Sequence, residues 1–500
     1  MKRAPMPAQQ GISASNGVGD CIENRRQRRA AGFWAFRRFA FRPIRQMKNL
    51  ALRLISIAVM LVLAPAPACR AYSLLTHEQL IDLTWHDSIV PLLLSQYPGL
   101  TAAELDRARS YAYGGCVIQD IGYYPFGDRS FSNLTHYVRS GDFVVSLFRN
   151  ARNADELAFA IGALSHYMGD SYGHSEATNR AVPVEFPQLG AEYGPVVSYA
   201  EGQHQHVQTE FAFDIDEIAH HHLAPLRYLR HIGLNVPRRQ LGLAFYQTYG
   251  LTDFAGHRAH RFKVREYRFA VRTFIPRIAY AVTLLRRKHE PAEPDTSDAI
   301  EIEKEAEAAA ALDDWNAYRT GRPSFETRIL AAFLFILPKV GPLALANVKG
   351  PTPATDVEYM HSVSQSTAAL RYALRRFTPV AARMASPEGA AALEQPFGPR
   401  NPLHPLPNRD LDTGYVVRPG GYSLTDSTYA LLLHRLAEHP SQPIPPGIKS
   451  DIEGFYSDPN APITTKKHTA EWARVQADLK TLEGMTTSNA PEPYPTYDSQ

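Results

Sequence analysis

Three side chains with metal-binding groups follow one another at four-residue intervals in the stretch Leu164–His174, namely His166, Asp170 and His174. If this stretch is helical, each step of four residues turns a side chain only about 40° around the axis, so all three share one face. Imidazole and carboxylate are ligands that Zn²⁺ prefers, at about 2.0–2.2 Å. The alternative is an ordinary amphipathic helix with two incidental histidines.

A second pair of the same kind lies downstream, where His206 and Glu210 again stand four residues apart. His204 is a rival ligand, but the residue four positions after it is Gln208 and not a carboxylate. Two pairs of histidine and carboxylate within one short region indicate a metal site and lower the weight of the alternative.

Three more ligand candidates lie at the edges of predicted helices: His77, Asp120 and His136. From residue 72 to about residue 284, apolar residues recur at helical spacing, and short stretches rich in Gly, Pro and Asp separate the runs. Each candidate alone is a weak signal, since a single Asp before an apolar residue is more often a helix cap. Together with the two pairs they form a set.

This order of residues resembles that of the zinc-dependent phospholipase C family, whose relatives include glycosylphosphatidylinositol phospholipase D and the three-zinc, single-strand-specific nucleases. The resemblance implies nine metal ligands in chain order: Tyr72, His77, Asp120, His136, His166, Asp170, His174, His206 and Glu210. Three residues separate Asp170 from His174, as in the glycosylphosphatidylinositol enzyme, whereas bacterial phospholipases and the nucleases have five. Tyr72 stands where several relatives have Trp, which ligation through the backbone amine and carbonyl would tolerate.

The resemblance also implies a fold and a reaction. The fold is mainly α-helical, and three zinc ions are expected. One is held by Asp120, His136, His166 and Asp170; the second by Tyr72, His77 and a bridging Asp170; the third by His174, His206 and Glu210. Zinc-bound hydroxide would attack a phosphodiester in line, with Asp120 doubling as the base. We therefore expect an exported, phospholipase C-like hydrolase that acts on phospholipid headgroups at a membrane surface.

Charge and targeting signals divide the chain at about residue 71. Residues 1–71 contain 13 of the 53 Lys and Arg but only two of the 50 acidic residues, so the remainder has 40 basic and 48 acidic residues and a net charge of −8. From Met47, two basic residues precede the apolar run Leu54–Leu63 and a small-residue stretch that ends at Ala71. This pattern predicts a signal peptide cleaved near Ala71 and export to the periplasm or the cell exterior.

Two features of the leader allow other interpretations. Residues 1–46 are Arg-rich and show no core-forming pattern, so they are either a misassigned start or a cytoplasmic anchor. Cleavage after Ala68 would expose Cys69, a weak match to a lipoprotein site. Beyond the leader only Cys116 remains, so internal disulfides are excluded in the mature chain and metal ions are the more plausible cross-links.

Two other functions compete with a phospholipase. A single-strand nuclease would need basic and aromatic residues to bind its substrate, and the net charge of −8 disfavours nucleic acid but leaves it open. A non-catalytic, zinc-stabilised helical protein would be indicated by an incomplete ligand set, whereas this set is complete. The oligomeric state is not readable from the sequence.

The predicted catalytic domain covers residues 72–287 and is followed by a linker at 288–300, a helical region of unknown role at 301–485 and a polar tail at 486–500. Within the helical region, Ile329–Leu337 is interpreted as a buried core helix, with membrane docking as the alternative. Residues 387–425 are rich in Pro, Gly and Asn and are expected to be irregular. The triplet at 220–222, three consecutive histidines, is interpreted as part of a solvated helix face.

Overall fold

Helices provide the regular structure of the chain, as the hydrophobic pattern predicts. The computed structural model describes residues 74–123, 127–251, 258–286, 295–313, 315, 325–336, 350–377, 406–458, 461–462 and 467–488. These ranges contain no β-strand, only the isolated bridges Arg409–Val416 and Ile444–Thr487, so the prediction of a mainly α-helical fold is confirmed. Among the described helices, none has the length and apolar character needed to cross a membrane.

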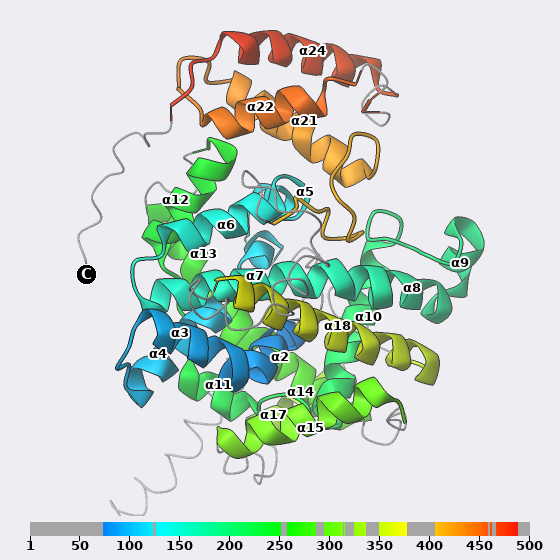
Figure 1. Ribbon diagram of the computed structural model, residues 1–500. Helices are drawn as coiled ribbons and strands as arrows, with labels where there is room; N and C mark the ends of the chain where they lie inside the picture. Colours follow the sequence, from blue (N-terminus) through cyan, green and yellow to red (C-terminus); the bar gives the residue numbers. More distant parts are fainter. Residues whose placement is uncertain are drawn as a thin grey trace, which may run out of the picture. The chain divides into compact units, whose positions relative to one another are not determined.

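Residues 74–286, the family-like part of the chain, contain a series of short and medium helices (Figure 1). In chain order they are α2 (Leu74–Thr84), η1 (Trp85–Ile89), α3 (Val90–Gln96), α4 (Ala102–Gly115), η2 (Gln119–Gly122), α5 (Arg129–Tyr137), α6 (Ser140–Asn150), α7 (Ala154–Tyr172), η3 (Gly173–Thr178), α8 (Asn179–Glu185), α9 (Pro187–Tyr193), α10 (Gln203–Ala219), α11 (Leu226–Ile232), α12 (Arg238–Tyr249), α13 (Arg258–Phe269), η4 (Ala270–Phe274) and α14 (Ile275–Arg286).

The C-terminal region adds further helices, as the sequence predicts for residues 301–485. They are α15 (Ser297–Leu312), α17 (Phe325–Ile336), α18 (Pro353–Phe377), α21 (Ser423–Ala437), α22 (Pro446–Phe455) and α24 (Thr469–Gly484). On α17 the side chains of Leu330, Ala331 and Leu334 are buried, while Phe325 and Phe335 are 71% and 74% exposed. The core-helix interpretation of this run therefore holds for one face of α17.

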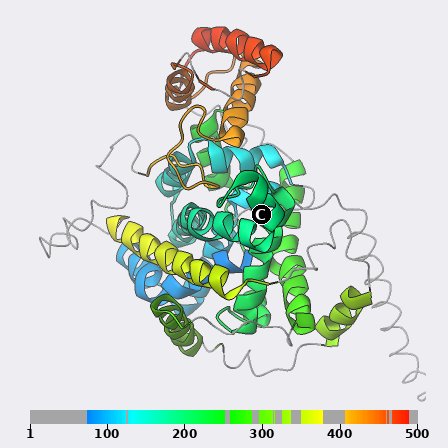
Figure 2. The same cartoon turned by 90° about the vertical axis from the view of Figure 1, so that its right-hand side faces the viewer.

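Helix α7 is the element around which the others pack. Asn153 caps its start by accepting a hydrogen bond from the backbone N–H of Glu156 at 2.9 Å. Most of its side chains are buried, because α4, α6 and α18 all pack against it (Figures 1 and 2). The α4 contact is very close: a Cβ at Gly162 would lie 2.1 Å from the carbonyl oxygen of Ala112. Only glycine fits there.

One apolar core joins helices from both sides of the predicted linker. It contains Leu80 of α2, Phe213 of α10, Ile302 of α15 and Tyr359 of α18, with the rings of Phe213 and Tyr359 stacked at 4.4 Å. All described residues belong to one compact unit, Ala64–Gln500. The predicted domain boundaries stay a prediction, but the described helices α15 and α18 share a core with the family-like part.

A buried cation ties α4 to the C-terminal region. Arg109 is 1% exposed; its Nη2 lies 2.5 Å from Asp82 Oδ1 and its Nη1 lies 2.7 Å from Asp313 Oδ2. We expect Arg109→Met to lower the free energy of unfolding by about 3–5 kcal/mol, because it leaves two buried carboxylates without their cation. Denaturant unfolding of the zinc-loaded chain measures the effect.

The matched control is Arg107→Met on the same helix. The side chain of Arg107 is 55% exposed and pairs with Asp155 at 2.9 Å, so its loss should cost less than about 1 kcal/mol. Similar losses of stability in the two variants would contradict the importance of the buried cation.

Candidate metal centre

Eight of the nine residues that the family resemblance implies come together near the C-terminal half of α7. Each of these residues is at most 3% exposed. They are His77 on α2, Asp120 on η2, His136 on α5, His166 and Asp170 on α7, His174 on η3, and His206 and Glu210 on α10. The ninth, Tyr72, lies outside the described residues. That these side chains hold zinc stays a prediction.

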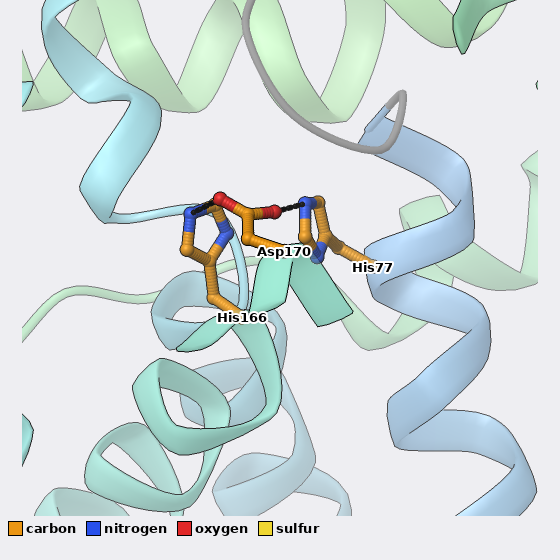
Figure 3. Close-up of side chains that lie close together, drawn as sticks. All are labelled: His77, His166 and Asp170. Carbon is orange, nitrogen blue, oxygen red and sulfur yellow. Dashed lines mark ion pairs between the residues drawn. The ribbon is translucent and has the colours of Figure 1, made fainter. Parts of the chain in front are cut away.

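Asp170 lies between two imidazole rings (Figure 3). Its Oδ1 is 3.2 Å from Nε2 of His77, and its Oδ2 is 3.1 Å from Nε2 of His166. Gly169 makes this approach feasible, since a Cβ at that position would lie 3.2 Å from His77 Nδ1. A carboxylate that turns one oxygen toward each neighbour has the arrangement needed to bridge two cations.

His136 joins the same group from the other side. Its Nε2 lies 3.3 Å from Asp120 Oδ1, 3.3 Å from Asp170 Oδ2 and 3.4 Å from Nε2 of His166. The Nδ1 atoms of His136 and His166 donate hydrogen bonds to the carbonyl oxygens of Ser132 at 2.7 Å and Cys116 at 3.0 Å. A carbonyl can only accept, so each Nδ1 carries a proton, and Nε2 is the nitrogen through which each ring could bind a metal ion.

A third group of ligand candidates, His174, His206 and Glu210, begins one helical turn after Asp170. The chain leaves the α-helix at Tyr172 and continues as the π-helical turn η3, which carries His174 toward α10. Glu210 Oε1 lies 3.0 Å from Nε2 of His206 and 3.4 Å from Nε2 of His174. The rival candidate His204 is exposed and outside the group. A π-helical turn at a cluster of this kind is a common feature of functional sites.

The protonation of the histidines and carboxylates around Asp170 depends on their burial and on the charges that lie close to them. Burial acts to lower the pKa of His136, but Asp120 and Asp170 outweigh it and raise that pKa to about 9. Burial acts to raise the pKa of Asp170, while His166, His136 and His77 hold it well below its ordinary value. Protons thus balance the carboxylates when no cation is bound. A divalent cation would replace those protons.

The donor set fits zinc in chemistry and in spacing. Each of three groups places its donor atoms within 4.8 Å of one another: His77, His166 and Asp170; Asp120, His136 and His166; His174, His206 and Glu210. Tetrahedral ligands at about 2.0–2.1 Å from zinc lie about 3.3 Å apart, close to the pair distances observed. Both carboxylate oxygens of Asp170 and of Glu210 are buried without a hydrogen bond from any described residue, as metal-binding atoms are before the ion binds.

One residue beside the centre has no signal in the sequence. Asp412, fully buried, places its Oδ1 3.6 Å from Nδ1 of His174. It belongs to the stretch that the sequence predicts to be irregular, and residues 406–422 do form turns and a bridge rather than a helix. No spacing rule connects a loop residue to a helix more than 200 positions earlier, so sequence reasoning did not find it.

The histidine triplet differs from its prediction. Only His221 is exposed, whereas His222 is 3% exposed and lies 3.3 Å from Glu217, and His220 lies 3.2 Å from Asp216. The solvated-face interpretation is therefore wrong for His220 and His222. The reason is that α10 ends at Ala219, and a positive φ of 64° at His221 turns the chain back onto the helix.

Asp356 of α18, near this histidine pair, should make stability depend on pH. Burial, with Asp216 and Glu217 nearby, raises the pKa of Asp356 to about 8, against about 3.9 in an unfolded chain. The folded state therefore holds a proton that the unfolded state has lost, and its stability falls as pH rises from about 4 to about 8. We therefore expect the free energy of unfolding of Asp356→Asn, relative to that of wild type, to be higher at pH 8 than at pH 5 by on the order of 3 kcal/mol.

Urea unfolding at several pH values tests this expectation. Asp106→Asn, at an exposed position on α4, is the control and should parallel wild type at every pH. A wild-type to Asp356→Asn difference that does not change with pH would show that this carboxyl is ionised in the folded state.

Comparison with known proteins agrees with this geometry. Residues 76–258 match the family described as zinc dependent phospholipase C. All eight described ligand candidates fall within that range, while Asp412 falls outside it. No curated protein and no solved structure matches the chain. Residues 76–258 of the chain are thus similar to the zinc-dependent phospholipase C family.

Proposed function

We propose that the protein is a zinc-dependent phosphodiesterase that cleaves phospholipid headgroups in the manner of a phospholipase C. The observation that supports this proposal most is Asp170, which turns one carboxylate oxygen toward His77 and the other toward His166, with His136 3.3 Å away. When bound, paired zinc ions supply Lewis acids and acidify a water molecule. A pair of cations held beside Asp170 would suit a phosphodiester, because it would stabilise both the attacking and the leaving oxygen of an in-line displacement at phosphorus.

The chain's own residues would divide the remaining work. His77, Asp120, His136, His166 and Asp170 would hold the paired ions, and His174, His206 and Glu210 would hold the third. Asp120, whose Oδ1 lies 3.3 Å from Nε2 of His136, would also act as the base that accepts the proton of the attacking water. No side-chain nucleophile is required.

A substrate comparison tests the proposal. Zinc-loaded protein is offered vesicles of phosphatidylcholine or phosphatidylinositol, or single-stranded DNA, and products are identified by mass spectrometry. We expect diacylglycerol and a phosphorylated headgroup from at least one lipid, and little cleavage of DNA. Phosphatidate as the lipid product would indicate D-type cleavage instead. Cleavage of DNA alone would support a nuclease, and no cleavage of any substrate would support a non-catalytic zinc protein.

A lipid surface is the partner that we propose. The exposed rings of Phe325 and Phe335, both on α17, are aromatic side chains of the kind that insert into the headgroup region of a bilayer. Sedimentation of the protein with phosphatidylcholine vesicles should weaken several-fold when both are replaced by Ser. Unchanged sedimentation would argue against this surface.

We also propose that the protein is exported and cleaved near Ala71, so that the free amine of Tyr72 becomes a ligand. His77, in the first turn of α2, already contacts Asp170 at 3.2 Å, and Tyr72 lies two residues before the start of that helix. A neutral amine with an ordinary pKa near 8 can bind zinc, whereas a peptide nitrogen has no available lone pair. The alternative is that Tyr72 only begins the first helix and that a water molecule, not the amine, binds the zinc ion.

A Gly-Ser extension before Tyr72 distinguishes the two. We expect the extended chain to lose about one zinc per molecule and most of its activity, while the chain that begins at Tyr72 keeps both. Equal zinc content and equal activity would show that the amine is not a ligand.

A further inference from the structure

The segment from Leu406 to Tyr422, which belongs to the C-terminal region and not to the matched family range, lies against the metal centre. Its backbone is hydrogen-bonded to three helices, of which α5 and α7 carry ligand candidates. Tyr167 of α7 donates a hydrogen bond to the carbonyl of Pro407 at 2.7 Å, and the N–H of Leu411 donates to the carbonyl of His136 at 3.1 Å. Asn179 of α8 donates to the carbonyl of Asp412 at 2.7 Å. The segment is thus held in place on both sides of Asp412.

The contact with α7 is close enough to require glycine. Gly414 has a φ of 73°, and a Cβ there would lie 2.4 Å from the carbonyl oxygen of Ser171. A larger residue would have to push the segment away from the helix that carries Asp170 and precedes His174.

The carboxylate of Asp412 is oriented by two tyrosines. Its Oδ2 accepts hydrogen bonds from the hydroxyls of Tyr137 and Tyr422, each at 2.7 Å, and its backbone N–H donates to Asp410 Oδ1 at 3.0 Å. With Oδ2 engaged in this way, Oδ1 faces Nδ1 of His174 at 3.6 Å. The whole side chain is buried.

The two nitrogens of His174 therefore have different neighbours. Nε2 lies 3.4 Å from Glu210 Oε1, on the side where His206 completes the third group, and Nδ1 faces Asp412. At 3.6 Å the charge of the Asp412 carboxylate favours a proton on this far nitrogen, so that the near nitrogen keeps its lone pair for a metal ion. Loss of such a partner typically weakens metal binding 10- to 100-fold.

We propose that Asp412 is a positioning residue for the third metal site, formed by His174, His206 and Glu210, through which the C-terminal region completes a centre whose described ligand candidates all lie within residues 76–258. The proposal rests on zinc binding by His174, His206 and Glu210, which belongs to the proposed function. It does not depend on which phosphodiester is cleaved. The role of the C-terminal region would then be to supply the carboxylate of Asp412, which lies outside the matched range and faces Nδ1 of His174.

The test uses the full mature chain and zinc or cobalt(II) as the probe. For Asp412→Asn we expect one metal ion per chain to be released to a competing chelator at 10- to 100-fold lower chelator concentration, with the remaining ions unchanged. The visible spectrum of the cobalt-substituted chain should change at one site only. Asp412→Glu, which keeps the carboxylate, should recover part of the affinity.

Asp451→Asn is the matched control. Asp451 lies on α22 of the same region and likewise accepts a tyrosine hydroxyl, from Tyr429 at 2.9 Å. This variant should release metal like wild type. Tyr137→Phe is a smaller change that removes one of the two tyrosine hydrogen bonds to Asp412. It should lower the affinity for the same metal ion by a few-fold, and it tests the proposal even if Asp412→Asn does not fold.

The outcomes separate this proposal from the proposed function. If wild type binds no metal at the third metal site, the proposed function fails in that respect, and this inference with it. If wild type holds that ion, and Asp412→Asn and Tyr137→Phe both release it as wild type does, only the role of Asp412 is wrong. Equal weakening in Asp451→Asn would also overturn it, because the effect would then be one of general stability.

Discussion

Asp170→Asn is expected to remove more than one zinc ion per chain and to lower phosphodiesterase activity by at least about 100-fold, or about 2.7 kcal/mol of transition-state stabilisation. The reason is its position: one oxygen lies 3.2 Å from His77 and the other 3.1 Å from His166. Removing a bridging charge leaves two cations facing each other with less anionic compensation. Metal analysis by inductively coupled plasma mass spectrometry, with activity assays, measures both losses.

Glu210→Gln provides the comparison, since Glu210 contacts only the third group, through His206 at 3.0 Å and His174 at 3.4 Å. We expect it to lose no more than about one zinc per chain. If the two variants lost equal amounts of zinc, Asp170 could not be the bridging ligand.

Removal of zinc from wild type is expected to destabilise the fold as well as abolish activity. The residues Asp120, Asp170 and Glu210 are at most 3% exposed, and burying their carboxylates without a cation is costly. Structural zinc contributes apparent energies of about 10–16 kcal/mol, against about 5–15 kcal/mol for the stability of a typical domain. We expect the melting temperature to fall by at least about 10 °C in excess chelator.

Calorimetry with chelator, followed by addition of excess zinc, tests this expectation. Restored melting would show that the loss came from the metal, and the zinc-depleted Asp170→Asn variant should respond to chelator less than wild type. Coincident melting curves with and without chelator would mean that the metal has no structural role.

Local sequence patterns predicted the features that depend on residues close together in the chain, namely the helices and the ligand pairs that lie on one helix. Helical periodicity predicted the helices between residues 72 and 284, and four-residue spacing placed His166 and Asp170 on one face of α7. Within the group formed by His174, His206 and Glu210, the His206 and Glu210 pair was readable because both residues lie on one helix, α10.

Other features depend on contacts that no local pattern encodes. The π-helical turn at Gly173–Thr178 differs from the single α-helix that four-residue spacing suggests, yet it carries His174 to a separate group. His222 is buried because the chain reverses at His221. Asp412 reaches His174 only through the packing of residues 406–422 against α5, α7 and α8.

Counting the zinc ions on the mature chain by native mass spectrometry tests the central claim most directly. The chain that begins at Tyr72 is purified, reconstituted with excess zinc and exchanged into a volatile buffer before measurement. We expect three zinc ions per chain, and one fewer in a variant with both His206 and Glu210 replaced by Ala. A folded wild-type chain that retains no zinc, or a double variant that retains as many ions as wild type, would contradict the assignment of these residues to a zinc centre.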